Sequence, residues 1–220
     1  MIDPMSPNPT ENLIERLASE LTPTARSAVS RFICLALVAG AGVSALTVLW
    51  LWGIRPDMRA ALSTGSLWLK EGFVVALAIA GIFSMIRLAR PDGTAGGPAA
   101  IAIGAACVMA LLAIVELAGA SPAVWKTLVM GKTWATCPWL ILALAVPVLI
   151  GSICAMRSMA PTRLRLAGAA CGLASGALSA LVYSVACDES AVAFVLVWYG
   201  GAIALATLAG AWLGPRVLRW

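Results

Sequence analysis

The chain has 220 residues, of which 61% are hydrophobic and only 11% charged, and its mean hydropathy is +0.95. A soluble domain carries about 45–50% apolar and about 25% charged residues, so this chain has too few polar side chains to cover its surface in water. The net charge is +5 and histidine is absent, which removes the usual general base and the commonest metal ligand.

Residues 1–30 are predicted to form a cytoplasmic tail with one short amphipathic helix over residues 10–21. Thr10 can cap its N-terminus and Pro23 blocks its continuation. Its apolar face consists of Leu13, Ile14, Leu17, Ala18 and Leu21. A helix of about twelve residues is marginal by itself, so something has to cover this face. Three glutamates against one arginine make an anionic bilayer a poor partner, and a groove on a cytosolic protein is favoured over the membrane surface.

Six apolar stretches come after the tail, and we expect them to cross a membrane as helices. They cover residues 32–54, 72–86, 99–118, 137–156, 166–187 and 191–213. The second is short and is expected to recruit Trp68 and Leu69 before it, or Leu88 and Ala89 after it. Backbone groups in lipid must pair within their own segment, and these runs do not alternate as the strands of a barrel would. Residues 31–220 are therefore predicted to be an all-α, polytopic bundle of six transmembrane helices.

The basic residues predict which side of the membrane each connection faces. The tail, the second and fourth connections and the C-terminal end hold ten basic residues, and the remaining connections hold five. The positive-inside rule then places both termini in the cytoplasm of a bacterial inner membrane. The positive charge is explained by this orientation and by lipid headgroups, so direct binding of nucleic acid is not indicated.

Glycines in the fifth stretch, Gly168, Gly172 and Gly176, are spaced four residues apart. Such a row forms a groove in which another helix can approach closely. Packing inside the bundle is the simpler interpretation, and a homodimer through this stretch is the alternative.

No motif indicates an enzyme or a cofactor, because Cys-x-x-Cys, phosphate-binding glycine loops and hydrolase motifs are all absent. Glu116 is the only charged residue within the predicted spans, which makes it a functional candidate. It also lies about one turn from the outer end of its span, where it can reach water. A small transporter or channel for a metal or an oxyanion, using Glu116, Lys126 and Lys132, is therefore the competing function.

Two of the six cysteines differ from the others in position. Four fall inside spans or near their inner ends, where a cysteine behaves as a small hydrophobic residue. Cys137 opens the fourth span and Cys187 closes the fifth, so both are expected at the outer boundary, facing the oxidising periplasm. Because these spans are antiparallel neighbours, the two thiols could form a functional pair. The alternative is that they are two further small residues at helix interfaces.

The first outer connection carries the group Arg55, Asp57, Trp68 and Lys70. One interpretation is a salt-bridged loop with a tryptophan at the membrane interface. The other is a rim around the thiols that tunes their pKa.

Several short motifs, in this order along nearly the whole chain, resemble the NrsF-type family, the negative regulators of sigma F. They are Leu13-Ile14, Leu17-Ala18, Leu21-x-Pro23, Gly53-x-Arg55-Pro56-Asp57, Trp68-x-Lys70, Arg90-Pro91, Cys137, Ala160-Pro161, Gly168 to Gly172, Tyr183 with Cys187, Trp198-Tyr199, and Arg216 with Arg219-Trp220.

The resemblance implies a six-span membrane anti-sigma factor that sequesters an extracytoplasmic-function sigma factor and releases it under heavy-metal or oxidative stress. It implies that Cys137 and Cys187 are the sensing pair, with oxidation or capture of a soft metal as the signal. It also implies that the tail is the sigma-binding element. Its anchors would be Leu13, Ile14, Leu17 and Leu21.

Overall fold

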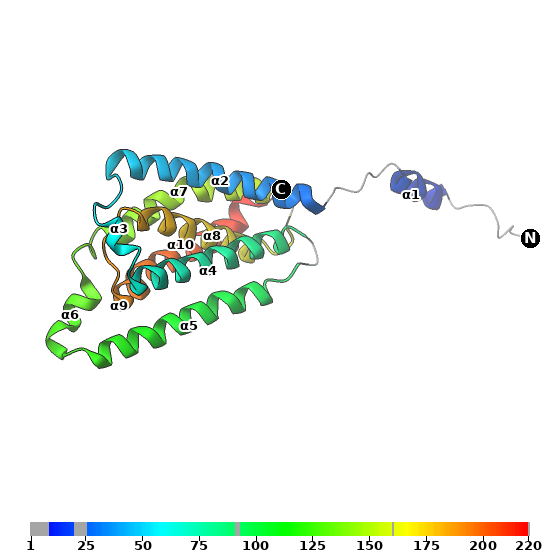
Figure 1. Cartoon of the computed structure of the whole chain (residues 1–220). Helices are drawn as coiled ribbons and strands as arrows, with labels where there is room; N and C mark the ends of the chain where they lie inside the picture. The colour runs from blue at the N-terminus through cyan, green and yellow to red at the C-terminus, as the bar shows by residue number, and fades with distance from the viewer. Residues whose placement is uncertain (1–8, 20–25, 91–92, 160, 220) are drawn as a thin grey trace, which may run out of the picture.

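The computed structural model describes residues 9–19, 26–90, 93–159 and 161–219, and every regular element in these ranges is a helix (Figure 1). The elements are α1 (Pro9–Ser19), α2 (Arg26–Leu51), α3 (Met58–Ala61), α4 (Gly65–Leu88), α5 (Gly96–Gly119), α6 (Pro122–Met130), α7 (Cys137–Arg157), α8 (Leu164–Ser184), α9 (Val192–Phe194), the π-helix η1 (Val195–Tyr199) and α10 (Gly200–Val217).

Six helices of the described chain are long and apolar enough to cross a membrane, which confirms the predicted all-α, six-span fold. They are Val29–Leu51, Gly65–Leu88, Gly96–Gly119, Cys137–Arg157, Leu164–Ser184 and Val192–Val217. The last span runs without a break through α9, η1 and α10. These segments differ from the predicted ones only at their ends, by at most seven residues, and the start of the fourth, at Cys137, is the same.

Two of these differences involve residues at the outer end of the bundle. The second span extends beyond 72–86 at both ends. At its start, Lys70 and Glu71 continue the helix instead of ending it. The fifth span ends at Ser184, so Cys187 lies in the connection after α8 rather than in the last turn of the helix. At the opposite end, α2 begins at Arg26, within the residues assigned to the tail.

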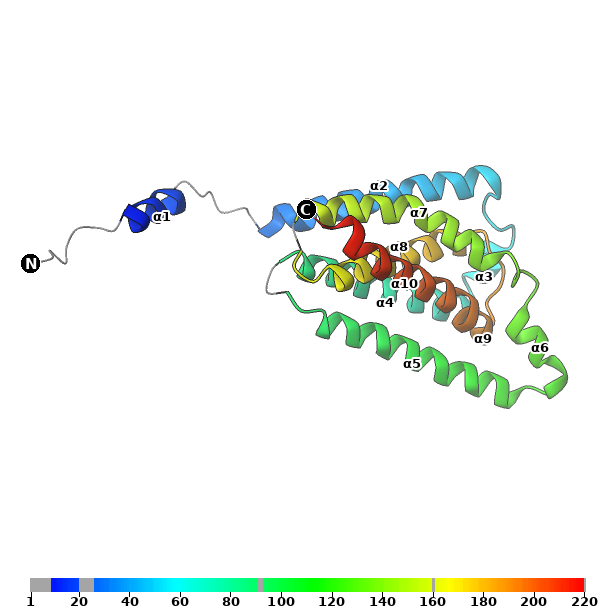
Figure 2. The ribbon, with the colours of Figure 1, turned by 180° about the vertical axis from the view of Figure 1, so that it is seen from behind.

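The central helix of the bundle is α8, which packs against α2, α4, α7 and α10. At the edge lies α5, which contacts chiefly α4 and α9 (Figure 1). The N-terminal end of α2 and the C-terminal end of α10 lie at the same end of the bundle, whereas α3, α6 and α9 lie at the other end (Figures 1 and 2). Both ends of the bundle segment therefore leave on one side.

The glycine row of α8 is buried against α10. A Cβ added at Gly168 would overlap the carbonyl oxygen of Gly210, and one at Gly172 would lie 2.8 Å from the Cα of Thr207. A Cβ at Gly176 would lie 3.0 Å from that of Ala206. The row thus serves packing within the bundle, and α10 occupies the face through which the alternative homodimer would form.

A second close contact joins α2 to α7 near Pro147. A Cβ on Gly40 would lie 2.6 Å from the Cα of Val148 and 3.0 Å from the carbonyl oxygen of Pro147. The hydroxyl of Ser44 donates a hydrogen bond to the carbonyl oxygen of Leu144, at 2.7 Å. Because proline has no N–H, a neighbouring hydroxyl is one way to satisfy backbone oxygens near the break in the helix. The contact couples the span that begins with Cys137 to the span that leads into the tail.

Candidate functional site

The structure brings the two outer cysteines together. Cys137 is the first residue of α7 and is fully buried, and Cys187, in the connection between α8 and α9, is 3% exposed. Both are free thiols, and a hydrogen bond joins their side chains. The site therefore holds two adjacent reduced sulfurs at the end of the bundle opposite the chain termini, screened from bulk water by the surrounding helices.

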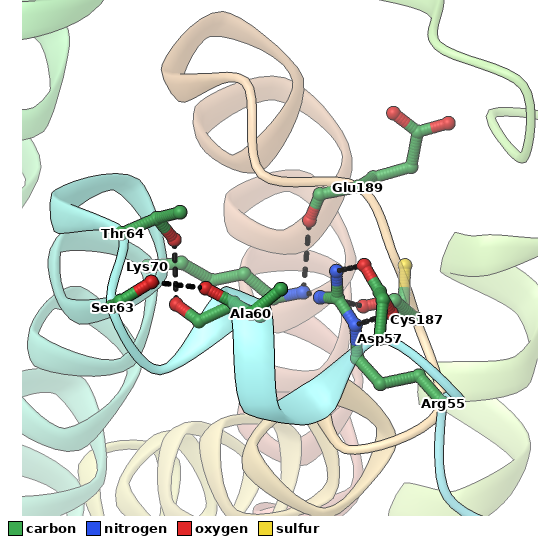
Figure 3. A network of polar contacts seen from close by, with 9 residues as sticks. Arg55, Asp57, Ala60, Ser63, Thr64, Lys70, Cys187 and Glu189 are labelled. Atoms are coloured by element: carbon green, nitrogen blue, oxygen red, sulfur yellow. Dashed lines mark hydrogen bonds and ion pairs between the residues drawn. The ribbon is translucent and has the colours of Figure 1, made fainter.

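Lys70 of α4 is a buried cation beside this pair. Its side chain is 0% exposed, and its Nζ donates hydrogen bonds to the carbonyl oxygens of Cys187, at 3.2 Å, and Glu189, at 2.9 Å (Figure 3). The same Nζ lies 4.9 Å from the centre of the Tyr199 ring, within cation–π range. Burying an ammonium group is costly unless it is paired, and these contacts offset the cost. Lys70 thereby holds the connection that carries Cys187.

Arg55 binds the same carbonyl group from the other side. Gly53, with φ of +71°, ends α2 in a conformation that favours glycine and turns the chain toward Arg55. The guanidinium of Arg55 donates to Cys187 O at 3.1 Å and forms a two-pronged pair with Asp57, at 2.7 and 2.6 Å. This pairing raises the pKa of Arg55 and lowers the pKa of Asp57. Two cations thus converge on the backbone of Cys187 (Figure 3).

The environment favours a thiolate at Cys187. A hydrogen bond from the Cys137 thiol, followed by the positive charge of Lys70, lowers the pKa of Cys187, although burial acts in the opposite direction. The thiolate is the form of cysteine that attacks disulfides and oxidants and binds metals. The pair is therefore arranged as one nucleophilic sulfur and one neighbouring sulfur that can complete a disulfide.

Both tyrosines of the chain lie in the same buried cluster as the thiols. The rings of Tyr183, near the end of α8, and Tyr199, at the end of η1, have centroids 6.2 Å apart. Neither tyrosine was predicted as a site residue. The available signal was that the only two tyrosines fall near the outer ends of the spans on either side of Cys187.

Both interpretations of the Arg55 group apply, and Arg55 itself takes part in both. Arg55 and Asp57 form the predicted salt bridge, while Arg55 and Lys70 also contact the residue that carries the thiol. Trp68 is 61% exposed and donates to the carbonyl oxygen of Leu62 at 3.0 Å, so it belongs to the surface and not to the site.

Metal capture by the pair is restricted by the number of ligands. Among the described residues, no group of three or more His, Cys, Asp and Glu side chains could hold a metal ion. Cys137 and Cys187 offer two sulfur ligands, fewer than the four that a structural zinc site uses. A metal at this position would need two-coordinate binding or ligands beyond these side chains.

Comparison with known proteins assigns the chain to a family. The family model described as negative regulator of sigma F, NrsF, matches residues 17–220. The chain belongs to the NrsF family. It is 37% identical to the probable anti-sigma-F factor NrsF of Azospira oryzae over 96% of this chain and 99% of that protein. It is 35% identical to the anti-sigma-F factor NrsF of Caulobacter vibrioides, with the same coverage. No solved structure is significantly similar.

Membership of the NrsF family makes the chain a regulatory protein of the anti-sigma type rather than an enzyme. Its partner is accordingly a sigma factor. The predicted amphipathic helix is present as α1, and Leu13, Ile14 and Leu17 are each more than half exposed. Leu21 lies outside the described residues. The three described residues of the predicted anchor set, Leu13, Ile14 and Leu17, therefore form an exposed apolar face in this NrsF protein.

Glu116 has a structural role in this NrsF protein. Its carboxylate accepts hydrogen bonds from the backbone N–H groups of Val192, at 3.1 Å, and Ala193, at 2.8 Å. Val192 and Ala193 are the first two residues of the last span. Backbone N–H donors in the first turn of a helix lack partners within the helix, and a negative charge is favourable there. The backbone N–H of Lys132 donates to the side chain of Glu189 at 2.5 Å. Glu116, on which the transporter alternative depended, thus caps the last span, and the backbone of Lys132 joins the connection after α6 to Glu189.

Proposed function

We propose that the chain holds an extracytoplasmic-function sigma factor at the bacterial inner membrane and releases it when Cys137 and Cys187 are oxidised or capture a soft metal. The observation that carries the sensing part is the buried thiol pair beside Lys70, whose charge lowers the pKa of Cys187. A thiolate at neutral pH reacts with oxidants and thiophilic metals far faster than a thiol.

The orientation rests on the distribution of charge over the two ends of the bundle. The end from which both termini emerge carries most of the arginines, and the thiols lie at the opposite end. The positive-inside rule then places the tail in the cytoplasm, where a sigma factor is found, and the thiols toward the periplasm.

The orientation can be tested by labelling single cysteines in intact cells with an impermeant maleimide. In a cysteine-free background, a cysteine at position 126 should react with the reagent, and one at position 163 should not.

The binding element in this proposal is the uncovered face of α1. Leu13, Ile14 and Leu17 repeat at helical spacing, as side chains do when a helix lies in a hydrophobic groove, and Leu21 continues the row. Each anchor contributes roughly 1.5–3 kcal/mol when it is fully buried, before the cost of ordering the tail is subtracted.

The chemistry of the signal is a two-electron oxidation or a metal–thiolate exchange. In the first case the Cys187 thiolate and the Cys137 thiol become a disulfide, while two electrons pass to the oxidant and the thiol proton is released. In the second, both sulfurs bind the metal and the remaining proton is displaced. Either product fixes the start of α7 to the connection after α8.

The route to the tail in this proposal runs along α7 to α2. Cys137 opens α7, and the contact of Gly40 and Ser44 with α7 near Pro147 lies midway along the two spans. A change in the position of α7 is passed to α2 because their backbones touch there and leave no space to absorb it. Since α2 continues into the tail, the two redox states present α1 differently, and the sigma factor favours one of them.

The test is a reporter gene that depends on the sigma factor, in cells exposed to an oxidant or to cadmium. Cys137→Ser and Cys187→Ser should each keep the reporter off under stress, whereas Cys107→Ser, which changes an exposed thiol of α5, should respond as the wild type does. Normal induction in both site variants would reject sensing by the pair.

The binding element is tested separately, by removing residues 1–23. This deletion should abolish recovery of a sigma factor with the purified chain. Recovery of the sigma factor with the shortened chain would reject the tail as the binding element.

A further inference from the structure

A hollow opens between α8 and α10 at the end of the bundle from which the termini emerge. Its volume is about 890 Å³, within the range of roughly 300–1,000 Å³ that is usual for small-molecule sites. It is lined by Arg165, Leu208, Ala211, Trp212, Pro215, Arg216 and Arg219. Neither the thiol pair nor the tail helix α1 involves these residues.

Three arginines line this hollow, and none of its described lining residues carries a carboxylate. Arg165 belongs to the first turn of α8, Arg216 to the last turn of α10, and Arg219 follows the end of α10. Arg216 is held in place, because its guanidinium lies 3.9 Å from the Trp212 ring centre and donates to the Trp212 carbonyl at 2.7 Å. Three cations that share a hollow repel one another, so an anion bound between them is strongly favoured. Guanidinium groups match phosphate oxygens in pairs of hydrogen bonds.

The remaining wall is apolar and opens toward the bilayer. Leu208 and Trp212 are 65% and 61% exposed, and both belong to the span Val192–Val217. Leu208 lies one turn from Trp212 on the same side of α10, farther from the helix end. Tryptophan is enriched where a span meets the headgroup layer, so the arginines lie at headgroup level and Leu208 lies at the level of the acyl chains. A water-soluble anion would use only the arginine end of this surface.

We propose that this hollow binds one anionic phospholipid of the membrane, such as phosphatidylglycerol. Its phosphate lies among Arg165, Arg216 and Arg219, and an acyl chain follows Leu208 and Trp212. Basic pockets between transmembrane helices on the cytoplasmic side are a recognised form of lipid site. The lipid would bridge the start of α8 and the end of α10. This inference does not depend on the sensing function, since it uses a different end of the bundle.

The experiment is native mass spectrometry of the purified full-length chain in a non-ionic detergent, titrated with phosphatidylglycerol or with phosphatidylcholine of the same acyl chains. The test variant is R165Q/R216Q/R219Q. The control variant is R87Q/R90Q/R157Q, which removes three exposed arginines at the same end of the bundle that do not line the hollow. Wild type and control should retain one phosphatidylglycerol at least tenfold more tightly than phosphatidylcholine, and the test variant should lose this preference.

Equal loss in the two triple variants would overturn the proposal, because it would show attraction by net charge alone. Equal retention of the two lipids by the wild type would also overturn it. Displacement of phosphatidylglycerol by millimolar inorganic phosphate would show that the hollow takes a soluble anion instead. If R165Q/R216Q/R219Q does not fold in detergent, the charge-conserving R165K/R216K/R219K replaces it. That variant should keep the preference for phosphatidylglycerol but bind it more weakly than the wild type, and unchanged binding would contradict recognition by the guanidinium forks.

Discussion

Substituting Lys70 with methionine tests whether a buried cation activates the thiol pair. Lys70 donates to the backbone of Cys187 and its charge is the second favourable cause of the lowered Cys187 pKa, after the hydrogen bond from Cys137. Methionine preserves much of the volume and removes the charge. We therefore expect Lys70→Met to raise the pKa of Cys187 toward its usual value of 9.0.

The size of the effect follows from the fraction of thiolate at each pH. At pH 7 a thiol with the usual pKa of 9.0 is about 1% ionised, so each unit by which the pKa lies lower raises the thiolate fraction by up to about tenfold. Lys70→Met removes one cause of the lowering, so the thiolate fraction of Cys187 at pH 7 should fall, and the rate of its reaction with it. The difference in thiolate fraction should shrink at pH 10, where a thiol with a pKa of 9.0 is itself mostly ionised.

The assay is the rate of modification of Cys187 by a small uncharged reagent, methyl methanethiosulfonate, measured by peptide mass spectrometry from pH 5 to pH 10. Lys126→Met is the control, since it removes an exposed lysine of α6. The wild type and this control should show a midpoint well below pH 9, and Lys70→Met a higher one. A wild-type midpoint near pH 9, or the same midpoint in Lys70→Met, would refute the electrostatic argument.

Three further predictions concern packing and caps, each measured as the unfolding free energy in detergent micelles. Gly40→Ala should destabilise the bundle and alter basal reporter activity, because its Cβ would press on the α7 backbone, while Gly42→Ala, with nothing within 4 Å, should change neither. Gly172→Ala should cost about 1–3 kcal/mol by overpacking, and Gly104→Ala, which also has open space, should be neutral or slightly stabilising. Glu116→Gln should cost about 1–3 kcal/mol, because an amide oxygen replaces the charged acceptor of two N–H groups, and no loss at all would contradict the capping role.

The number of spans and their order could be predicted from the sequence because uncharged runs of sufficient length are a strong signal in a membrane protein. The second span shows where the rule fails. Charged residues were taken to end the helix, yet Lys70 continues it, because backbone oxygens of the neighbouring connection and an aromatic ring replace water around its ammonium group. A charge marks the end of a span only when it has no partner inside the protein.

The candidate site was predictable in part. The order of the spans placed Cys137 and Cys187 at the same end of neighbouring helices, and the structure brings them together. The convergence of Lys70 and Arg55 on the Cys187 carbonyl could not be derived, because it depends on the irregular path of residues 185–191. That path in turn depends on where α8 ends, and hydrophobicity places helix ends only within a few residues. The same uncertainty concealed the cap that Glu116 provides.

The glycine row of α8 has a mechanical consequence for the thiol pair. Because Gly168 and Gly172 let α8 and α10 meet backbone to backbone, these two helices and the short segment between them form a rigid hairpin. Cys187 is carried by that hairpin and is further restrained through its own carbonyl by Lys70 and Arg55. In the proposed signal, a bond or a metal that joins the two sulfurs would therefore displace Cys137 more than Cys187. The displacement would begin at the start of α7 and reach the contact with α2 near Pro147.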